Sequence, residues 1–124
     1  MSSTLFTPYK LGPVTLRNRT IRSAAFESMG KDFGPTRQLK DYHVAVARGG
    51  VGMTTLAYAA VCRSGLSFNK QLWLRPEIVP GLREITDAVH REGAAAAIQI
   101  GHCGNMTHWT TAGQMPIGAS TGFN

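Results

Sequence analysis

The chain has 124 residues, of which 43% are hydrophobic and 16% charged, so it predicts one globular domain over residues 1–124 and excludes a disordered or coiled-coil protein. The formal charge of +6 comes from 13 scattered Lys and Arg residues without a run of about five or six and without interleaved aromatics, which argues against a nucleic-acid partner. At most, this charge favours anionic ligands such as phosphates.

No apolar run approaches the ~20 residues that span a membrane, so we expect no membrane partner. The opening segment Met1–Phe6 lacks the basic start and long apolar core of a secretory signal. We therefore expect a cytoplasmic protein. In that compartment the two cysteines, Cys62 and Cys103, are expected to be free thiols.

The chain begins with a predicted hairpin and a first strand. Residues 5–19 alternate apolar and polar positions and are interrupted by Pro and Gly-Pro, as in a short hairpin. Thr20–Phe26 is the first predicted strand of the main sheet. Its small residues Ser23, Ala24 and Ala25 would let a ligand approach the backbone closely, although tight packing against another strand explains them equally well.

A helix and a second strand follow. Thr36 can cap a helix that extends to about Ala47, where apolar residues recur at helical spacing, and a Gly-Gly pair ends it. Val51–Val61 is apolar without clean alternation, which is typical of a strand that is covered on both faces in a parallel sheet. Residues 62–76 are predicted to be a loop.

The last predicted elements are a second helix and a third strand. Pro76–Glu92 carries one apolar stripe formed by Ile78, Leu82, Ile85 and Val89. Ala94–Gly104 is the third strand. Strands that alternate with helices in this way require parallel pairing, so the sequence predicts an α/β fold.

Gln99 interrupts the apolar third strand. A buried amide without hydrogen-bond partners costs roughly 1–3 kcal/mol, so Gln99 either binds a planar polar ligand or reaches neighbouring backbone or water. Ligands of parallel α/β folds sit at the carboxyl ends of the strands. That rule selects Ser23–Phe26, Ala57–Ala60 and Gln99–Gly104, and it favours the ligand interpretation of Gln99.

Known motifs for nucleotides and metals are absent. The chain lacks the glycine-rich fingerprints of dinucleotide and nucleoside-triphosphate sites, and it lacks His-Glu-x-x-His and paired Cys-x-x-Cys, so we expect no metal site despite His102, Cys103 and His108. Adjacent residues of a strand point to opposite faces. His102 and Cys103 are therefore not expected to form a catalytic pair.

Five motifs, the first made of two stretches, resemble the N-terminal part of the old yellow enzyme family of FMN-dependent NADH:flavin oxidoreductases. In the family's order and spacing they are Leu5–Pro8 with Leu16–Arg19, Gly34–Thr36, Tyr42–His43, Gly49–Gly52 and Ile98–Gly104. The resemblance covers the chain to about His108. It implies a (β/α)8 TIM barrel in which FMN lies across the carboxyl ends of the strands.

The resemblance also implies roles for individual residues. The expected FMN contacts are Ser23, Ala24, Ala25 and Phe26 at the isoalloxazine, Tyr58 at the end of the second strand, and Gln99 at the pyrimidine edge. An amide suits that edge because it offers a donor and an acceptor together. Ser28 is expected near the substrate. Phe26 stands where many members have Thr or Cys, and Tyr58 stands where they have a much smaller residue.

By this resemblance the chain is part of an FMN-dependent NAD(P)H:acceptor oxidoreductase of the ene-reductase type, with NAD(P)H as reductant and an activated alkene or similar acceptor as substrate. Three of the eight strands of a barrel of about 250 residues are present, so the chain is expected to be inactive without the remainder of the barrel, and a homo-oligomer is compatible with it. The catalytic residues are not identified.

Two alternatives remain. The chain could be a non-catalytic binding or complementing module that pairs with another chain through its sheet edges. It could also be a small open α/β domain for another nucleotide, although the missing glycine fingerprint argues against that.

Overall fold

The structure is a computed structural model that describes residues 3–120; the start of the Met1–Phe6 segment and the last four residues of the predicted 1–124 domain lie outside this range. Short 3-10 turns occur at Thr4–Phe6, Arg63–Gly65, Pro76–Ile78 and Gly104–Met106. The strands and helices, in chain order, are β1 Tyr9–Leu11, β2 Val14–Leu16, β3 Ile21–Arg22, α1 Arg37–Arg48, β4 Met53–Ala60, β5 Leu72–Trp73, α2 Val79–Arg91, β6 Ala95–Gly101 and α3 Trp109–Ala112.

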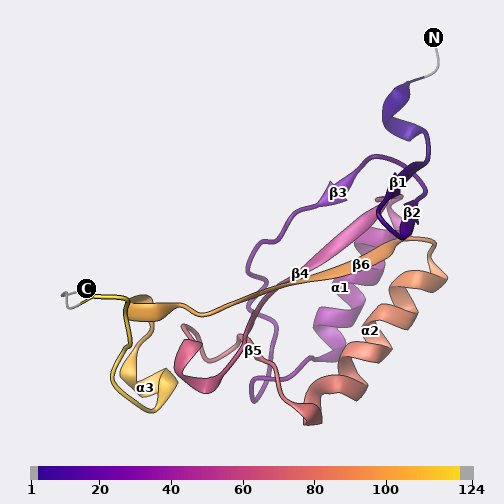
Figure 1. Cartoon of the computed structure of the whole chain (residues 1–124). Helices are drawn as coiled ribbons and strands as arrows, with labels where there is room; N and C mark the ends of the chain where they lie inside the picture. The colour runs from indigo at the N-terminus through magenta and orange to yellow at the C-terminus, as the bar shows by residue number, and fades with distance from the viewer. Residues whose placement is uncertain (1–2, 121–124) are drawn as a thin grey trace.

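The main sheet is built around β4, which has parallel neighbours on both edges. β6 pairs with β4 along most of its length, whereas β3 pairs only with its first residues, Met53 and Thr54, and β5 only with its last, Ala59 and Ala60. Helices α1 and α2 lie side by side on one face of this sheet (Figure 1). No helix within residues 3–120 is long and apolar enough to cross a membrane.

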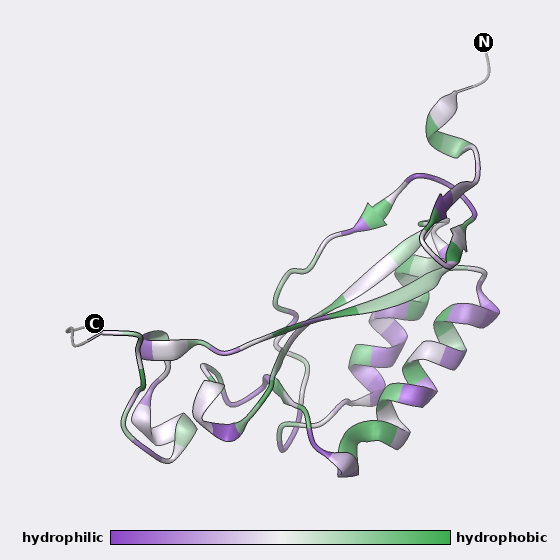
Figure 2. Cartoon of the chain, in the orientation of Figure 1, coloured by the Kyte–Doolittle hydropathy of each residue, from purple (hydrophilic) through white to green (hydrophobic). Residues whose placement is uncertain are grey.

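The core lies between the sheet and these two helices. Leu39 of α1 and Ile85 and Val89 of α2 are almost fully buried and pack against Leu56 and Ala59 of β4. Both helices carry hydrophobic and hydrophilic residues, whereas β4 and β6 are mostly pale to green (Figure 2). The apolar stripe of each helix therefore covers the sheet, and its polar residues remain in solvent.

The N-terminal hairpin is fixed at the amino end of the sheet. β1 and β2 pair antiparallel, as predicted for residues 5–19. The Arg17 guanidinium donates to the carbonyl of Val51 at 2.8 and 3.0 Å, to that of Glu92 at 2.7 Å and to that of Ala47. One side chain thus binds carbonyl groups at the ends of both helices, where the last carbonyls lack the usual partner four residues on.

The predicted order of strands and helices and their parallel pairing are confirmed. Thr36 caps α1 by accepting the Leu39 N–H at 3.1 Å. The second and third strands are slightly shorter than predicted, at Met53–Ala60 and Ala95–Gly101.

Two predictions of local structure are wrong. The first strand was expected over Thr20–Phe26 but contains only Ile21 and Arg22, because the chain then leaves the sheet and side chains take over its contacts with β4. The predicted loop 62–76 contains a strand, β5, although Leu72 and Trp73 are too few residues to show a strand periodicity.

Candidate functional site

Three segments follow the carboxyl ends of parallel strands and therefore meet at one edge of the sheet. These are Ser23–Phe26 after β3, the end of β4, and the end of β6 (Figure 1). In parallel α/β folds this edge carries the ligand. Phe26 and Tyr58 connect the first two segments, because their ring centroids lie 5.3 Å apart.

A cavity of about 230 Å³ lies at the ends of β4 and β6. It is lined by Tyr58, Gln99, Ile100, Gly101, His102 and Cys103. Complete pockets for small molecules usually have about 300–1,000 Å³. The cavity is therefore smaller than a complete small-molecule pocket.

Gln99 faces away from the helices. Side chains alternate along a strand, and its neighbour Ile98 packs against the core under α1 and α2. Gln99 is exposed, and its amide has no hydrogen bond among residues 3–120. The prediction that Gln99 lies in a buried strand is wrong. Within residues 3–120, no other element covers the face of β6 opposite the helices. An amide that offers both a donor and an acceptor is thus available to a ligand.

An irregularity in β4 places Tyr58 beside Gln99. Leu56 pairs with Ile98 and Ala59 with Ile100, so two residues of β4, Ala57 and Tyr58, lie opposite the single residue Gln99 of β6. Bulges of this kind redirect side chains and are frequent next to active sites. No feature of the sequence indicates this shift in register.

Tyr58 belongs to a group of aromatic rings. The Phe26 ring also stacks on Phe68, with 4.8 Å between the centroids, and Phe68 comes from the loop before β5. Burial, with a smaller contribution from the Cys103 thiol, raises the pKa of Tyr58, while a hydrogen bond with Ser67 opposes the shift. The Tyr58 phenol therefore stays protonated at neutral pH and keeps a proton to donate.

The other predicted site residues do not line the cavity. Ser23, Ala24 and Ala25 run from β3 to Phe26, and the Ala25 carbonyl accepts a hydrogen bond from Arg22 Nη2 at 3.1 Å. Ser28 is exposed and has a left-handed backbone, with φ of 56°. The structure thus joins Phe26, Tyr58 and Gln99 and leaves Ser28 apart from the cavity.

Polar contacts fix the end of β6. His102 Nε2 lies 3.1 Å from the Ser64 hydroxyl, and His102 Nδ1 accepts the Gly104 N–H at 2.9 Å. The Cys103 N–H donates to the Gly65 carbonyl at 3.2 Å. Both cysteines are free thiols, as predicted. No group of three potential metal ligands occurs within residues 3–120.

Sequence reasoning missed a buried charged group next to the site. Glu27 contacts Arg22 at 2.6 Å and His43 at 3.2 Å, and its side chain is only 3% exposed. Burial alone would raise the pKa of Glu27, but the contacts with His43, the Ala57 N–H and Arg22 outweigh it and hold the pKa below its ordinary value. The carboxylate is therefore ionised at neutral pH.

Comparison with known proteins gives consistent results. The family model described as the NADH:flavin oxidoreductase / NADH oxidase family matches residues 4–121. The chain is 48% identical over 100 residues to the 4,4'-dithiodibutanoate disulfide reductase of Rhodococcus erythropolis, with 81% of this chain and 25% of that protein covered. It is 45% identical over 115 residues to a probable N-methylproline demethylase of Rhizobium meliloti (strain 1021), with 91% and 17% covered.

Solved structures show the same fold. An old yellow enzyme homologue from Zymomonas mobilis superposes with a TM-score of 0.88 at 24% identity, over 97% of this chain and 34% of that one. A structure of morphinone reductase in complex with tetrahydroNAD superposes with a TM-score of 0.82 at 25% identity, over 93% and 32%. The chain thus spans about a third or less of these relatives and corresponds to the N-terminal portion of a TIM barrel, which its described residues do not close.

Proposed function

Because this chain belongs to the NADH:flavin oxidoreductase / NADH oxidase family, we propose that it supplies part of the FMN site of an NAD(P)H-dependent oxidoreductase of the ene-reductase type. The remaining strands of the barrel complete the site, since the chain spans 25% of the first of these curated relatives. When bound, FMN supplies hydride transfer between NAD(P)H and an acceptor such as an activated alkene. The protein binds and orients it.

Gln99 carries this proposal. Its exposed amide stands at the end of β6 beside the cavity and has no hydrogen bond among residues 3–120. The pyrimidine edge of a flavin presents adjacent donors and acceptors, and a carboxamide can pair with both kinds. Gln99 would therefore hold the flavin at this edge.

The other contacts follow from the strand ends. The small residues Ser23, Ala24 and Ala25 allow the isoalloxazine to approach the backbone after β3. Phe26 and Tyr58 offer apolar ring surface next to Gln99. Since Phe26 has no hydroxyl or thiol, this chain would present no side-chain donor at a position where many members of the family have Thr or Cys. Ser28 would lie toward the substrate.

The test uses the protein that carries this sequence at its natural length. We expect the purified protein to bind one FMN and to show flavin absorbance, and we expect NADH or NADPH to bleach that absorbance in the absence of oxygen. Comparing the two nicotinamides also gives the preferred reductant. A protein that binds no FMN even with the cofactor in excess contradicts the proposal.

One observation favours a second candidate function. The outer edge of β6 has no partner strand within residues 3–120, and Ile100 on this strand is 56% exposed. Such an edge can pair with another polypeptide. The chain would then act as a non-catalytic module that complements a separate barrel fragment.

A further inference from the structure

The edge of β4 that faces β3 and β5 has a gap in its ladder of backbone hydrogen bonds. β3 pairs with Met53 and Thr54, β5 pairs with Ala59 and Ala60, and within residues 3–120 no strand pairs with the residues between them on this edge. Backbone groups that lose their partners inside a protein destabilise it by an amount comparable to a lost hydrogen bond. These groups therefore need other partners.

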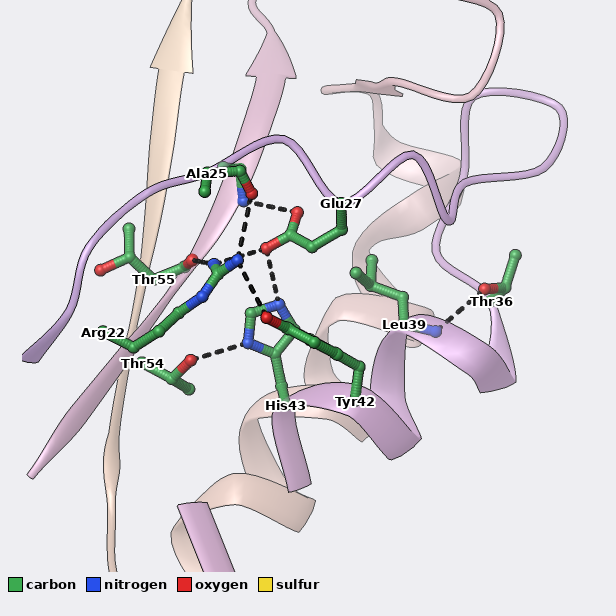
Figure 3. Close-up of polar contacts among 10 residues, drawn as sticks. Arg22, Ala25, Glu27, Thr36, Leu39, Tyr42, His43, Thr54 and Thr55 are labelled. Atoms are coloured by element: carbon green, nitrogen blue, oxygen red, sulfur yellow. Dashed lines mark hydrogen bonds and ion pairs between the residues drawn. The ribbon is translucent and has the colours of Figure 1, made fainter. Parts of the chain in front are cut away.

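Two side chains fill the gap. Arg22 Nη1 donates to the Thr55 carbonyl at 2.6 Å (Figure 3). The Ala57 N–H donates to Glu27 Oε2 at 3.1 Å. Arg22 and Glu27 also bind each other at 2.6 Å, between Nη1 and Oε1. A buried ion pair thus takes the place of the strand that would otherwise continue β3 along β4.

Helix α1 holds this ion pair from the other side. His43 is fully buried; its Nε2 lies 3.2 Å from Glu27 Oε1, and its Nδ1 lies 2.8 Å from the Thr54 hydroxyl. The Tyr42 hydroxyl accepts from Arg22 Nη2 at 3.3 Å, and the Arg22 guanidinium lies 5.2 Å from the centre of the Tyr42 ring. The ion pair is therefore tied to both α1 and β4.

The segment Ser23–Phe26 is the piece of chain between the two charged residues. Arg22 precedes it, Glu27 follows it, and Arg22 Nη2 donates to the carbonyl of Ala25 within it (Figure 3). Its last residue, Phe26, packs against Tyr58. The Arg22–Glu27 ion pair thus connects the two ends of the segment, and Arg22 also binds its interior. These contacts fix how far the segment bends away from the sheet.

We propose that Arg22 and Glu27 are positioning residues, which hold Ser23–Phe26 away from β4, where the segment would contact a bound flavin. This inference rests on the proposed function, because it assigns the segment to the flavin. A continued β-strand would keep these residues flat against β4. The ion pair allows them to leave the sheet while the backbone groups of β4 remain satisfied, and ligand-contacting segments need such support from a second layer of residues.

The experiment uses the flavin-loaded protein at its natural length with the variants Arg22→Lys and Glu27→Gln. Lysine keeps the positive charge but cannot bind Thr55, Ala25 and Glu27 together through a planar fork. The matched control is Glu92→Gln, which removes the carboxylate of another Arg–Glu pair, Arg48–Glu92, that also has a 2.6 Å contact but lies on the surface.

Three quantities are measured: hydrogen exchange at the amides of residues 24–26, the FMN dissociation constant, and the flavin absorption spectrum at saturating FMN. For Arg22→Lys we expect faster exchange in this segment than in β4, a dissociation constant raised about tenfold or more, and a shifted spectrum, while the control matches the unmodified protein. Glu27→Gln should show the same changes. If the Glu27→Gln variant does not fold, Arg22→Lys alone tests the proposal.

The outcomes separate the two proposals. Suppose that the unmodified protein binds FMN and that Arg22→Lys has the same hydrogen exchange, the same FMN dissociation constant and the same flavin spectrum at saturation. The positioning role is then wrong and the proposed function stands. A variant with a lower unfolding temperature but an unchanged spectrum at saturation assigns Arg22 a structural role only, which also overturns the inference. If the unmodified protein binds no FMN, both proposals fail.

Discussion

Glu27 combines three contacts on a carboxylate that is almost removed from water. Arg22, His43 and the Ala57 N–H surround it, and its side chain is 3% exposed. A buried pair gives little net stability by itself, since the loss of hydration offsets the attraction. Removing one partner is different, because it leaves the other charge buried and unpaired.

We therefore predict that Glu27→Gln lowers the free energy of unfolding by about 3 kcal/mol, the low end of the range for broken buried pairs, because Arg22 keeps 17% exposure. Denaturant titration at neutral pH measures this. The control Glu92→Gln, which breaks an exposed pair, should change stability much less. Equal losses in the two variants would contradict the burial argument.

The lowered pKa of Glu27 also predicts a pH dependence. The ordinary value is 4.5 and the folded value is lower, so the unfolded chain takes up a proton first as the pH falls. The stability that the carboxylate contributes is present above pH 4.5 and is lost as the pH falls through the lower folded pKa. Unfolding measured between neutral pH and pH 3 should show a flatter acid limb for Glu27→Gln. An unchanged acid limb would show that other groups cause the loss.

A site residue can be predicted from the sequence when it differs in character from the residues around it. Gln99 does, because an amide interrupts an apolar strand at the edge where ligands bind, and the structure places it beside a cavity. Glu27 does not. Its partner Arg22 is only five residues away, but the pair forms because Ser23–Phe26 leaves the sheet between them. Its other partner, His43, comes from α1 and looks in the sequence like one more position on the buried face of a helix.

At the scale of elements, helix α1 begins with a clear cap. Thr36 accepts the Leu39 N–H at 3.1 Å and donates to the Met29 carbonyl at 2.6 Å, so it joins the helix to the loop before it. We predict that Thr36→Ala lowers the free energy of unfolding by about 1 kcal/mol and that Thr36→Ser loses much less, since serine keeps the hydroxyl. Thermal or denaturant unfolding of both variants tests this. Equal losses for alanine and serine would assign the effect to the methyl group.

The start of β4 depends on a close approach of backbone. A Cβ on Gly52 would lie 2.5 Å from the Asn18 carbonyl oxygen and 3.0 Å from that of Thr20. We expect Gly52→Ala to destabilise the protein by about 1–3 kcal/mol, the range for overpacking. Gly101 at the end of β6 is the matched control, because a Cβ there meets no atom within 4 Å. If both alanine variants unfold alike, the contact with Asn18 is not the cause.

Elements with a strong periodicity were predictable, and short elements were not. The stripes of α1 and α2 and the apolar runs of β4 and β6 gave the α/β order and the parallel pairing. β3 and β5 have two residues each, so no alternation marks their bounds. The first strand was predicted too long, because its small residues are compatible with a strand, whereas beyond Arg22 the side chains of Arg22 and Glu27 bind the backbone of β4 in place of a strand.

At the scale of the whole molecule, the described residues form an open part of a fold that is closed in relatives. α1 and α2 cover one face of the sheet, and the opposite face and the outer edge of β6 are uncovered in residues 3–120 (Figure 1). The match to about a third or less of each relative explains both features, because the remaining barrel strands would cover them.

We predict that the 124-residue chain, expressed alone, associates with itself, and that a longer protein in which further barrel strands pair with β6 does not. Uncovered parallel strands pair readily with other chains. Sedimentation velocity over a range of concentrations measures the association. A stable monomer of the isolated chain would contradict both the barrel interpretation and the role as a complementing module.

The central claim is that the strand ends of this chain form part of an FMN site in which Gln99 binds the cofactor. The most direct measurement is the FMN dissociation constant, by fluorescence titration, of the natural-length protein, of Gln99→Ala, and of Gln38→Ala, which alters an exposed glutamine of α1. Losing a hydrogen-bonding amide predicts affinity about tenfold weaker for Gln99→Ala and unchanged for Gln38→Ala. Equal affinity in all three proteins would contradict the account.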